Sequence, residues 1–192
     1  SPYQEGAFAP ALCNRIDRNT GGIVIAAKTA EGLRVMNQKI RDRELKKYYL
    51  CIVHGTLPRP AGRLEGYILK DEAKKQVTVS SRPRPGAKTA VTLYETLAVR
   101  NGLSLVRCQL ITGRTHQIRA QFAAAGHPLL GDGKYGSERQ NKRYGRSYQA
   151  LYSYRLEFCF TTDAGALAPL DGQQFQVEQV DFVTEYFPGF SL

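Results

Sequence analysis

The sequence predicts an α+β domain built on a largely antiparallel mixed sheet with a few flanking helices. Runs rich in β-branched and aromatic residues recur along most of the 192-residue chain, whereas only two segments repeat apolar residues at helical spacing. Two of the strand-like runs, residues 90–99 and 103–111, are separated by Arg100-Asn101-Gly102. Asn-Gly tolerates the positive φ angles of a tight hairpin, so these runs are expected to pair antiparallel.

The first helix is expected to follow Thr29, whose hydroxyl can accept a backbone hydrogen bond at a helix N-terminus. Leu33, Met36 and Ile40 then recur at helical spacing as far as about Arg43, with charged residues between them. An amphipathic helix with one buried face is therefore predicted here.

The second helix is expected over residues 115–125, because Gly126 and Pro128 form a stop signal immediately after it. Strands are expected at residues 23–27, 48–53, 67–69, 77–79, 150–161 and 175–180, and irregular segments at residues 1–11, 82–86 and 131–145. The tail carries Phe182, Tyr186, Phe187 and Phe190. These aromatic residues are expected to pack against the core.

The charge balance points to a polyanionic partner. Lysine and arginine number 27 against 17 acidic residues, which gives a net charge of +10. Each phosphate that a basic side chain neutralises releases counterions, so RNA or DNA is favoured over a small neutral ligand. The basic residues form four clusters, namely residues 41–47, 70–75, 82–88 and 139–146. Tyr135, Tyr144 and Tyr148 lie near the last cluster and could stack on bases, although a tyrosine in such a position also serves core packing.

Cysteine usage indicates a reducing compartment. The four cysteines lie far apart, and none forms a CxxC metal or redox motif. We therefore expect a cytoplasmic protein without a metal site. No apolar run approaches the roughly 20 residues that cross a bilayer, so no membrane partner is expected.

A carboxylate between two arginines is the most informative local pattern. Arg15, Asp17 and Arg18 stand just before Gly21 and Gly22. Nearby positive charge favours an ionised carboxylate, and glycines allow a ligand or another backbone to approach. The pattern fits a nucleophile or general base, and it equally fits a surface ion pair at a turn.

Two further segments complete a resemblance. Lys47-Tyr48-Tyr49 and residues 110–119, running on to Asp132, follow the Asp17 segment in an order and spacing that resemble the RluA family of RNA pseudouridine synthases. The likeness extends from about Leu12 to about Phe158. It implies a pseudouridine synthase-like catalytic domain, an isomerase that converts specific uridines of structured RNA to pseudouridine without a cofactor. Ribosomal RNA is the favoured substrate, and transfer RNA is the other candidate.

The resemblance also implies the catalytic residues. Asp17 corresponds to the essential aspartate, which either adds to the sugar or removes a proton from it. Tyr49 corresponds to the tyrosine that stacks on the base and removes the last proton. Strand neighbours point to opposite faces, so only one of Tyr48 and Tyr49 can enter the site, and the spacing from Lys47 selects Tyr49. Arg119 corresponds to the arginine that pairs with the aspartate, and we expect its guanidinium fork on Asp17.

Six residues are expected to contact the substrate: Arg15, Arg18, Arg114, Thr115, His116 and Leu151. Arg114 suits a phosphate, His116 a positioning role and Leu151 the lining of the base pocket. The chain departs from the family pattern at Asn14, Gly21 and Gln121, which leaves the three catalytic positions intact. We expect residues 1–192 to form one catalytic domain without the N-terminal strand and S4-type RNA-binding module common in the family. We expect this domain to be a monomer.

Three rival functions remain open at this point. A non-catalytic RNA-binding or ribosome-associated module would share the charge and the tyrosines. A phosphodiesterase could use His116 or His127 as acid and base, although the histidines lack metal-ligand spacing. A nucleoside glycosidase would release free uracil, whereas a synthase returns the base to the same ribose.

Overall fold

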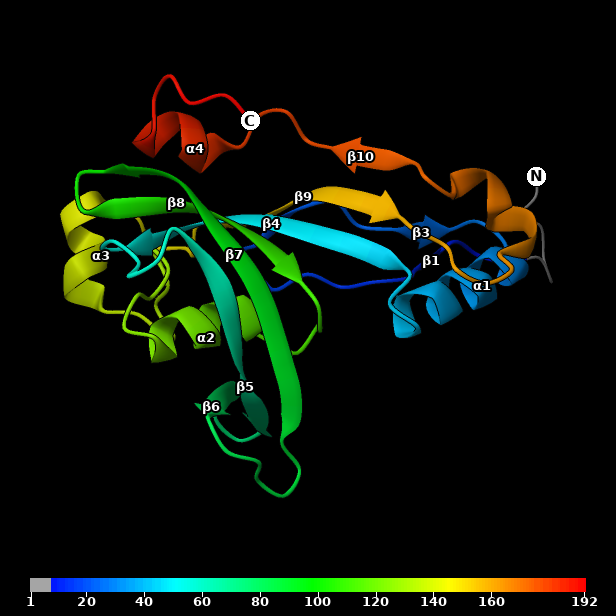
Figure 1. Ribbon diagram of the computed structural model, residues 1–192, viewed down its shortest axis with the longest axis horizontal. Coiled ribbons are helices and arrows are strands. Elements are labelled where there is room, and N and C mark those ends of the chain that lie inside the picture. The colour runs from blue at the N-terminus through cyan, green and yellow to red at the C-terminus, as the bar shows by residue number, and fades with distance from the viewer. Residues whose placement is uncertain (1–7) are drawn as a thin grey trace.

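A computed structural model of the protein describes residues 8–192 (Figure 1). The segment predicted to be irregular covers residues 1–11, and its first seven residues lie outside the described part of the chain. Residues 8–10 are irregular, and strand β1 (Ala11–Leu12) follows them directly. β1 pairs with β3 (Ala26–Ala27) in a small two-stranded ribbon.

The main sheet has eight strands, and its pairing is antiparallel except at one edge. Seven strands run in the order β10-β9-β4-β8-β7-β5-β6, and β2 pairs with β9 in parallel. Their bounds are β2 (Gly21–Gly22), β4 (Leu45–His54), β5 (Ala61–Asp71), β6 (Gln76–Ser80), β7 (Lys88–Arg100), β8 (Leu103–Leu110), β9 (Leu151–Phe158) and β10 (Gln174–Gln176). The predicted α+β class with a largely antiparallel mixed sheet is confirmed.

The tight turn between β7 and β8 forms as its sequence predicts. Asn101 and Gly102 adopt φ angles of 52° and 76°, the left-handed conformation that this pair tolerates best. β5, β6 and the start of β7 curve away from the rest of the sheet as a projecting arm (Figure 1). This arm carries the basic residues 70–75 and 82–88.

Helix α1 (Ala30–Arg41) confirms the first predicted helix and its cap. The Thr29 hydroxyl accepts a hydrogen bond from the Gly32 amide at 2.9 Å. The second predicted helix is α2 (Gln117–Ala124), which begins two residues later than expected because His116 lies outside it with φ 54°. Two short helices in the tail, the 3₁₀ helix η1 (Gly165–Leu170) and α4 (Asp181–Tyr186), were not predicted.

Two local predictions were wrong. Residues 138–144, expected to be irregular, form helix α3 (Glu138–Tyr144), capped by Ser137 and ended by Gly145 at φ 70°. Apart from its final tyrosine the helix is polar all round and buries Asn141 rather than an apolar residue, so it has no hydrophobic period to detect. Residues 23–27 do not form one buried strand. The chain turns at Gly22 (φ 126°) against the backbone of Ser153, and Val24 is 44% exposed.

The two faces of the sheet bury separate cores, and β4 contributes alternate residues to each. Leu50 and Ile52 face the C-terminal segment, where Phe182 and Phe187 are buried against them, as predicted for the aromatic tail. Cys51 and Val53 face α2 on the other side. Figure 1 shows α4 and α2 on opposite sides of the sheet. The site described next lies on the α2 side.

Within residues 8–192, no helix combines the length and apolar character that a membrane span requires. The four cysteines, Cys13, Cys51, Cys108 and Cys159, are all free thiols.

Candidate active site

Asp17 lies at the start of a turn that leads into β2. The Thr20 amide donates to the Asp17 carbonyl at 3.0 Å, and Asn19 adopts φ 63° within the turn. The buried Gln149 amide donates to the carbonyl of Arg18 at 2.6 Å and to the hydroxyl of Thr20 at 3.2 Å. The backbone beside Asp17 is thereby tied to the start of β9. The Asp17 side chain itself is 23% exposed, so a substrate can reach it.

A pocket with about 90 Å³ of open space surrounds this carboxylate. Its lining comprises Arg15, Ile16, Asp17, Thr20, Lys47, Tyr49, Leu110, Gly113, Arg114, His116, Gln117, Ile118 and Leu151. Two of the three residues assigned catalytic roles by resemblance and four of the six expected substrate contacts therefore share one pocket. Arg18 and Thr115 lie outside it. Within the described part of the chain, Asp17 is the sole carboxylate that lines the pocket.

Tyr49 reaches the pocket from the middle of the sheet. It is 9% exposed and belongs to the core on the α2 side, whereas Tyr48 packs against the core on the opposite side. A register shift in the pairing of β4 with β9 falls between these two residues. Burial raises the pKa of Tyr49, the Ser153 side chain opposes this increase, and the charge of Asp17 adds a smaller increase. The phenol is therefore protonated near neutral pH.

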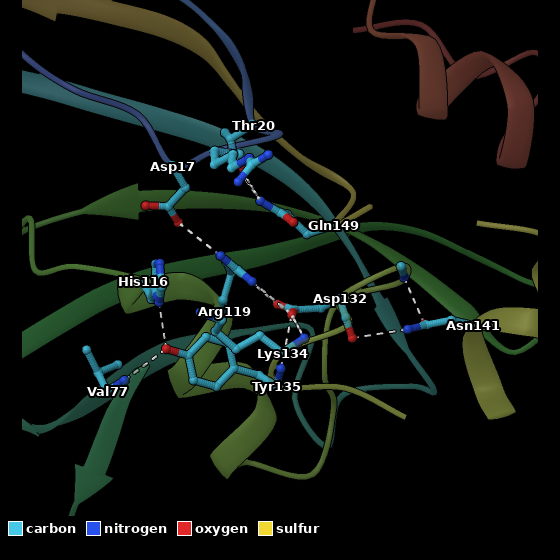
Figure 2. Close-up of polar contacts among 12 residues, drawn as sticks. Asp17, Thr20, Val77, His116, Arg119, Asp132, Lys134, Tyr135, Asn141 and Gln149 are labelled. Atoms are coloured by element: carbon cyan, nitrogen blue, oxygen red, sulfur yellow. Dashed lines mark hydrogen bonds and ion pairs between the residues drawn. The ribbon is translucent and has the colours of Figure 1, made fainter. Parts of the chain in front are cut away.

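Arg119 approaches Asp17 from α2, but its guanidinium fork lies elsewhere. Nη1 is 3.8 Å from Oδ2 of Asp17, beyond hydrogen-bond distance. Nε and Nη2 instead donate to the two carboxylate oxygens of Asp132 at 2.8 and 3.0 Å, as Figure 2 shows. The expected fork on Asp17 is thus wrong. Burial alone would lower the pKa of Arg119, but the hydrogen bond and charge of Asp132, with the charge of Asp17, raise it.

The two arginines adjacent to Asp17 in sequence do not pair with it. Both Arg15 and Arg18 are exposed, and neither places a nitrogen within 4.0 Å of an Asp17 oxygen, whereas Arg119 does. The interpretation of a carboxylate held between its sequence neighbours was therefore wrong, because the approaching cation comes from a helix about a hundred positions along the chain.

His116 is fixed by a residue that the sequence analysis considered only as a stacking surface. Its Nδ1 lies 2.6 Å from the Tyr135 hydroxyl, which also accepts the Val77 amide of β6 at 2.9 Å (Figure 2). Burial lowers the pKa of His116, the charge of Asp17 raises it, and the charge of Arg119 lowers it again, so the imidazole is neutral near pH 7. The Tyr135 ring lies 5.2 Å from the Arg119 guanidinium carbon, within cation–π range.

Two further hollows flank the Asp17 pocket, and all three share Arg114. One includes Arg41, Arg43 and Lys47, and the other includes Lys70, Lys88 and Thr115. Neither is lined by an acidic side chain. We call these residues, with Arg114, the basic groove. Arg114 is held in it by a hydrogen bond from Nε to the Thr89 carbonyl at 2.8 Å.

Lys47, Asp132 and Asn141 are among the members of the site that were not predicted from the sequence. Lys47 lines the pocket, and burial together with Arg43 lowers its pKa. Its position in the Lys-x-Tyr element was a usable signal. Asp132 holds the Arg119 side chain, and Asn141 holds the loop that carries Asp132. The glycine-rich sequence around Asp132 is the only sequence signal that points to these two residues.

Two other features bear on the choice of site. The largest hollow, about 760 Å³, lies between α1, β3, β9 and η1 and is mainly apolar. Of the described residues that line it, only Cys13 and Lys28 are titratable, so these residues offer little for acid–base chemistry. Among residues 8–192, no group of three His, Cys, Asp or Glu side chains is placed to hold a metal ion.

Comparison with known sequences identifies the family. A family model described as RNA pseudouridylate synthase matches residues 1–124. The chain is 38% identical over 156 residues to an uncharacterized RNA pseudouridine synthase of Mycoplasma genitalium, covering 79% of this chain and 47% of the relative. It is 31% identical over 181 residues to ribosomal large subunit pseudouridine synthase D of Zymomonas mobilis, covering 94% and 54%. The chain spans about half the length of these curated relatives.

Solved structures agree on the fold. Human RNA pseudouridylate synthase domain containing 4 superimposes with a TM-score of 0.71 at 23% identity, covering 90% of this chain and 72% of that one. Human RNA pseudouridylate synthase domain containing 1 gives 0.70 at 19% identity, covering 92% and 79%. The family model covers more than half of the sequence. The chain therefore belongs to the RNA pseudouridylate synthase family, which confirms the resemblance to RluA enzymes.

Proposed function

We propose that the protein is an isomerase that converts specific uridines in structured RNA to pseudouridine, with Asp17 as the catalytic aspartate. One observation carries the proposal. Among residues 8–192, one carboxylate alone lines the small pocket. It lies with a buried phenol and near a buried guanidinium, and a groove lined by basic residues runs past it. Family membership supports the reaction class, and this geometry supports the choice of Asp17, Tyr49 and Arg119.

The reaction balances without a cofactor. The bond between C1′ of the ribose and N1 of the base breaks, the base turns, and C1′ bonds to C5. The hydrogen at C5 leaves, and N1 gains one. Asp17 either adds to C1′ or removes a proton from the sugar. Tyr49 is the group that we assign to stacking on the base and to removal of the C5 proton, and Leu151 lines the base pocket.

The substrate is expected to enter base first. A pocket of about 90 Å³ suits a single everted base better than a stretch of helix, so the target uridine must leave its stack. The basic groove would then hold the phosphates on either side of the target uridine. Arg114 lines all three hollows, and Arg15, Arg18 and Thr115 would lie close to the RNA backbone. His116 positions the nucleotide rather than exchanging protons with it.

The proposed setting is ribosomal RNA in the cytoplasm, with transfer RNA as the alternative substrate. A relative named as a ribosomal large subunit synthase and the four free cysteines support this choice. We also propose that residues 1–192 act as one catalytic domain and as a monomer, because the turn before β2, strands β4, β8 and β9, and the loop and helix of α2 build the pocket from a single chain.

The phosphodiesterase alternative gains no support from the site. His127 does not line the pocket, and its Nδ1 lies 2.9 Å from the carbonyl of His54. His116 is neutral and bonded to Tyr135, so the two histidines do not form an acid–base pair.

Pseudouridine mapping tests the proposal in cells. Ribosomal and transfer RNA from cells with and without the gene are compared, and the gene is restored as wild type or as Asp17→Asn. We expect one or a few sites to lose pseudouridine and to regain it with wild type alone. A non-catalytic module would leave every site modified, and restoration by Asp17→Asn would exclude Asp17 as the catalytic residue.

A further inference from the structure

Asp132 is a buried carboxylate to which the proposed reaction assigns no step. Its exposed fraction is 0%, and it does not line the Asp17 pocket. A carboxylate without contact to the pocket cannot touch the ribose or the base. Any contribution to the reaction must therefore act through another residue.

The Asp132 carboxylate accepts hydrogen bonds from Arg119 and from the backbone of its own loop. Oδ2 accepts from Arg119 Nε at 2.8 Å, and Oδ1 accepts from Arg119 Nη2 at 3.0 Å. Oδ1 also accepts the backbone amides of Lys134 and Tyr135 at 2.9 and 3.0 Å. Burial alone would raise the pKa of Asp132, but these hydrogen bonds and the Arg119 charge lower it, so the group is ionised.

The loop that carries Asp132 is itself fixed by α3. The buried Asn141 donates from Nδ2 to the Asp132 carbonyl at 3.1 Å, and its Oδ1 accepts the Gly131 amide at 2.8 Å. His54 Nε2 lies 2.9 Å from the same Oδ1. Figure 2 shows this chain of contacts running from Asn141 through Asp132 and Arg119 to Asp17.

The planar shape of the Arg119 guanidinium links the position of Asp132 to that of Asp17. The group is planar, so an anion on the Nε and Nη2 edge fixes where the remaining nitrogen points. In this structure Nη1 faces Asp17 at 3.8 Å. Without Asp132, Arg119 would be free to close a two-bond fork on Asp17 and occupy both of its oxygens.

We propose that Asp132 is a positioning residue that holds the Arg119 fork away from Asp17. Arg119 then supplies a nearby positive charge while the oxygens of Asp17 stay free to react with the ribose. The inference rests on the proposed function, because it assumes that Asp17 is the reacting group. A merely structural role would instead limit Asp132 to stabilising its loop.

A double-mutant cycle separates the two roles. Asp132→Asn is compared with wild type and, in the Arg119→Ala background, with Arg119→Ala alone, using full-length protein and RNA that contains the target uridine. Glu44→Gln is the matched control, because Glu44 is a buried carboxylate paired with Lys39 beside α1, outside the pocket. Each variant is characterised by kcat, KM and thermal unfolding.

We expect Asp132→Asn to lower kcat by about 10²-fold, the usual cost of misplacing a catalytic group by roughly 1 Å. KM should change less than about 3-fold, and the loss in kcat should disappear in the Arg119→Ala background. Glu44→Gln should lower the unfolding temperature with kcat unchanged. Wild-type kcat in folded Asp132→Asn, or an equal loss in both backgrounds, would overturn the proposal.

Two further measurements cover the remaining outcomes. If Asp132→Asn does not fold, Arg119→Lys asks the same question, since one ammonium cannot serve both carboxylates, and wild-type kcat in it would overturn the proposal. Nitrogen-15 spectra of the arginine side chains need no activity. The Arg119 Nε proton should exchange slowly in wild type and rapidly in Asp132→Asn, and equal exchange would overturn the proposal. An inactive wild type with this difference present would refute the proposed function but not the positioning.

Discussion

Tyr48 and Tyr49 are consecutive on β4 and face opposite sides of the sheet. Tyr49 lines the pocket that contains Asp17. Tyr48 packs on the far side, with the Arg155 guanidinium carbon 5.4 Å from its ring. The pair provides a test and a matched control that differ by one position in the sequence and by one face of the sheet.

Tyr49→Phe should slow release of the C5 hydrogen by about 10²- to 10⁴-fold, the usual contribution of a positioned general base. RNA affinity should be retained because the ring remains. Burial raises the pKa of Tyr49, so the ionised base becomes more abundant as pH rises from neutral. The wild-type rate should therefore rise between pH 6 and 9, and the Tyr49→Phe rate should not. Tyr48→Phe should match wild type, and an equal effect of both substitutions would contradict the assignment.

Arg114→Ala should weaken RNA binding with little change in kcat. Loss of one phosphate contact reduces the slope of log affinity against log salt by about 0.7 for single-stranded RNA. RNA-binding titrations at salt concentrations between about 50 and 200 mM measure this slope. Arg63→Ala is the control, because Arg63 is 52% exposed, pairs with Glu65 and lies outside the basic groove. An unchanged slope in Arg114→Ala would remove Arg114 from the RNA path.

Gly131→Ala should destabilise the fold more than Gly126→Ala. Both glycines adopt left-handed φ angles, 83° and 85°, and this conformation costs an alanine about 1 kcal/mol. A methyl group at Gly131 would also collide with the Tyr148 carbonyl, whereas nothing lies within 4 Å of one at Gly126. We expect a further loss of about 1–3 kcal/mol at Gly131, measured by urea unfolding. Equal losses would show that the loop before Asp132 adapts freely.

Glu44 should contribute stability that disappears in acid. Burial would raise its pKa, but hydrogen bonds from Thr161, Thr162 and Lys39 outweigh this effect and lower the pKa to about 2. A lowered pKa in the folded state stabilises the protein above about pH 4.5, and the contribution is lost as pH falls toward 2. Urea midpoints between pH 6 and 3 should therefore fall less steeply in Glu44→Gln than in wild type. Parallel curves would contradict this account.

The sequence predicts those features that depend on local patterns. The opposite orientations of Tyr48 and Tyr49, the Asn101-Gly102 hairpin and the Thr29 cap each arise from neighbours within a few residues, and the structure contains all three. Helix α3 has local end signals in Ser137 and Gly145 but no apolar period, because polar contacts made by Asn141 hold it in place. The pattern of hydrophobic residues therefore cannot predict a helix that is stabilised in this way.

The candidate site shows the same limit. Asp17, Tyr49 and Arg119 could be selected by resemblance, yet the partner of the Arg119 fork could not. Asp132 lies 13 positions after Arg119 in an irregular loop. Its burial depends on how that loop packs against α2 and α3. Closeness in the sequence also gave a wrong prediction, because Arg15 and Arg18 lie within two positions of Asp17 but do not pair with it.

The most direct test of the central claim is hydrogen release from RNA labelled at C5 of its uridines. Purified full-length protein is incubated with this RNA, and wild type is compared with Asp17→Asn. Replacing the carboxylate by an amide keeps the shape of the side chain and removes its charge and basicity. We expect wild type to release label in proportion to the pseudouridine formed, and folded, RNA-binding Asp17→Asn to release none above background. Release by Asp17→Asn at the wild-type rate would contradict the assignment of Asp17.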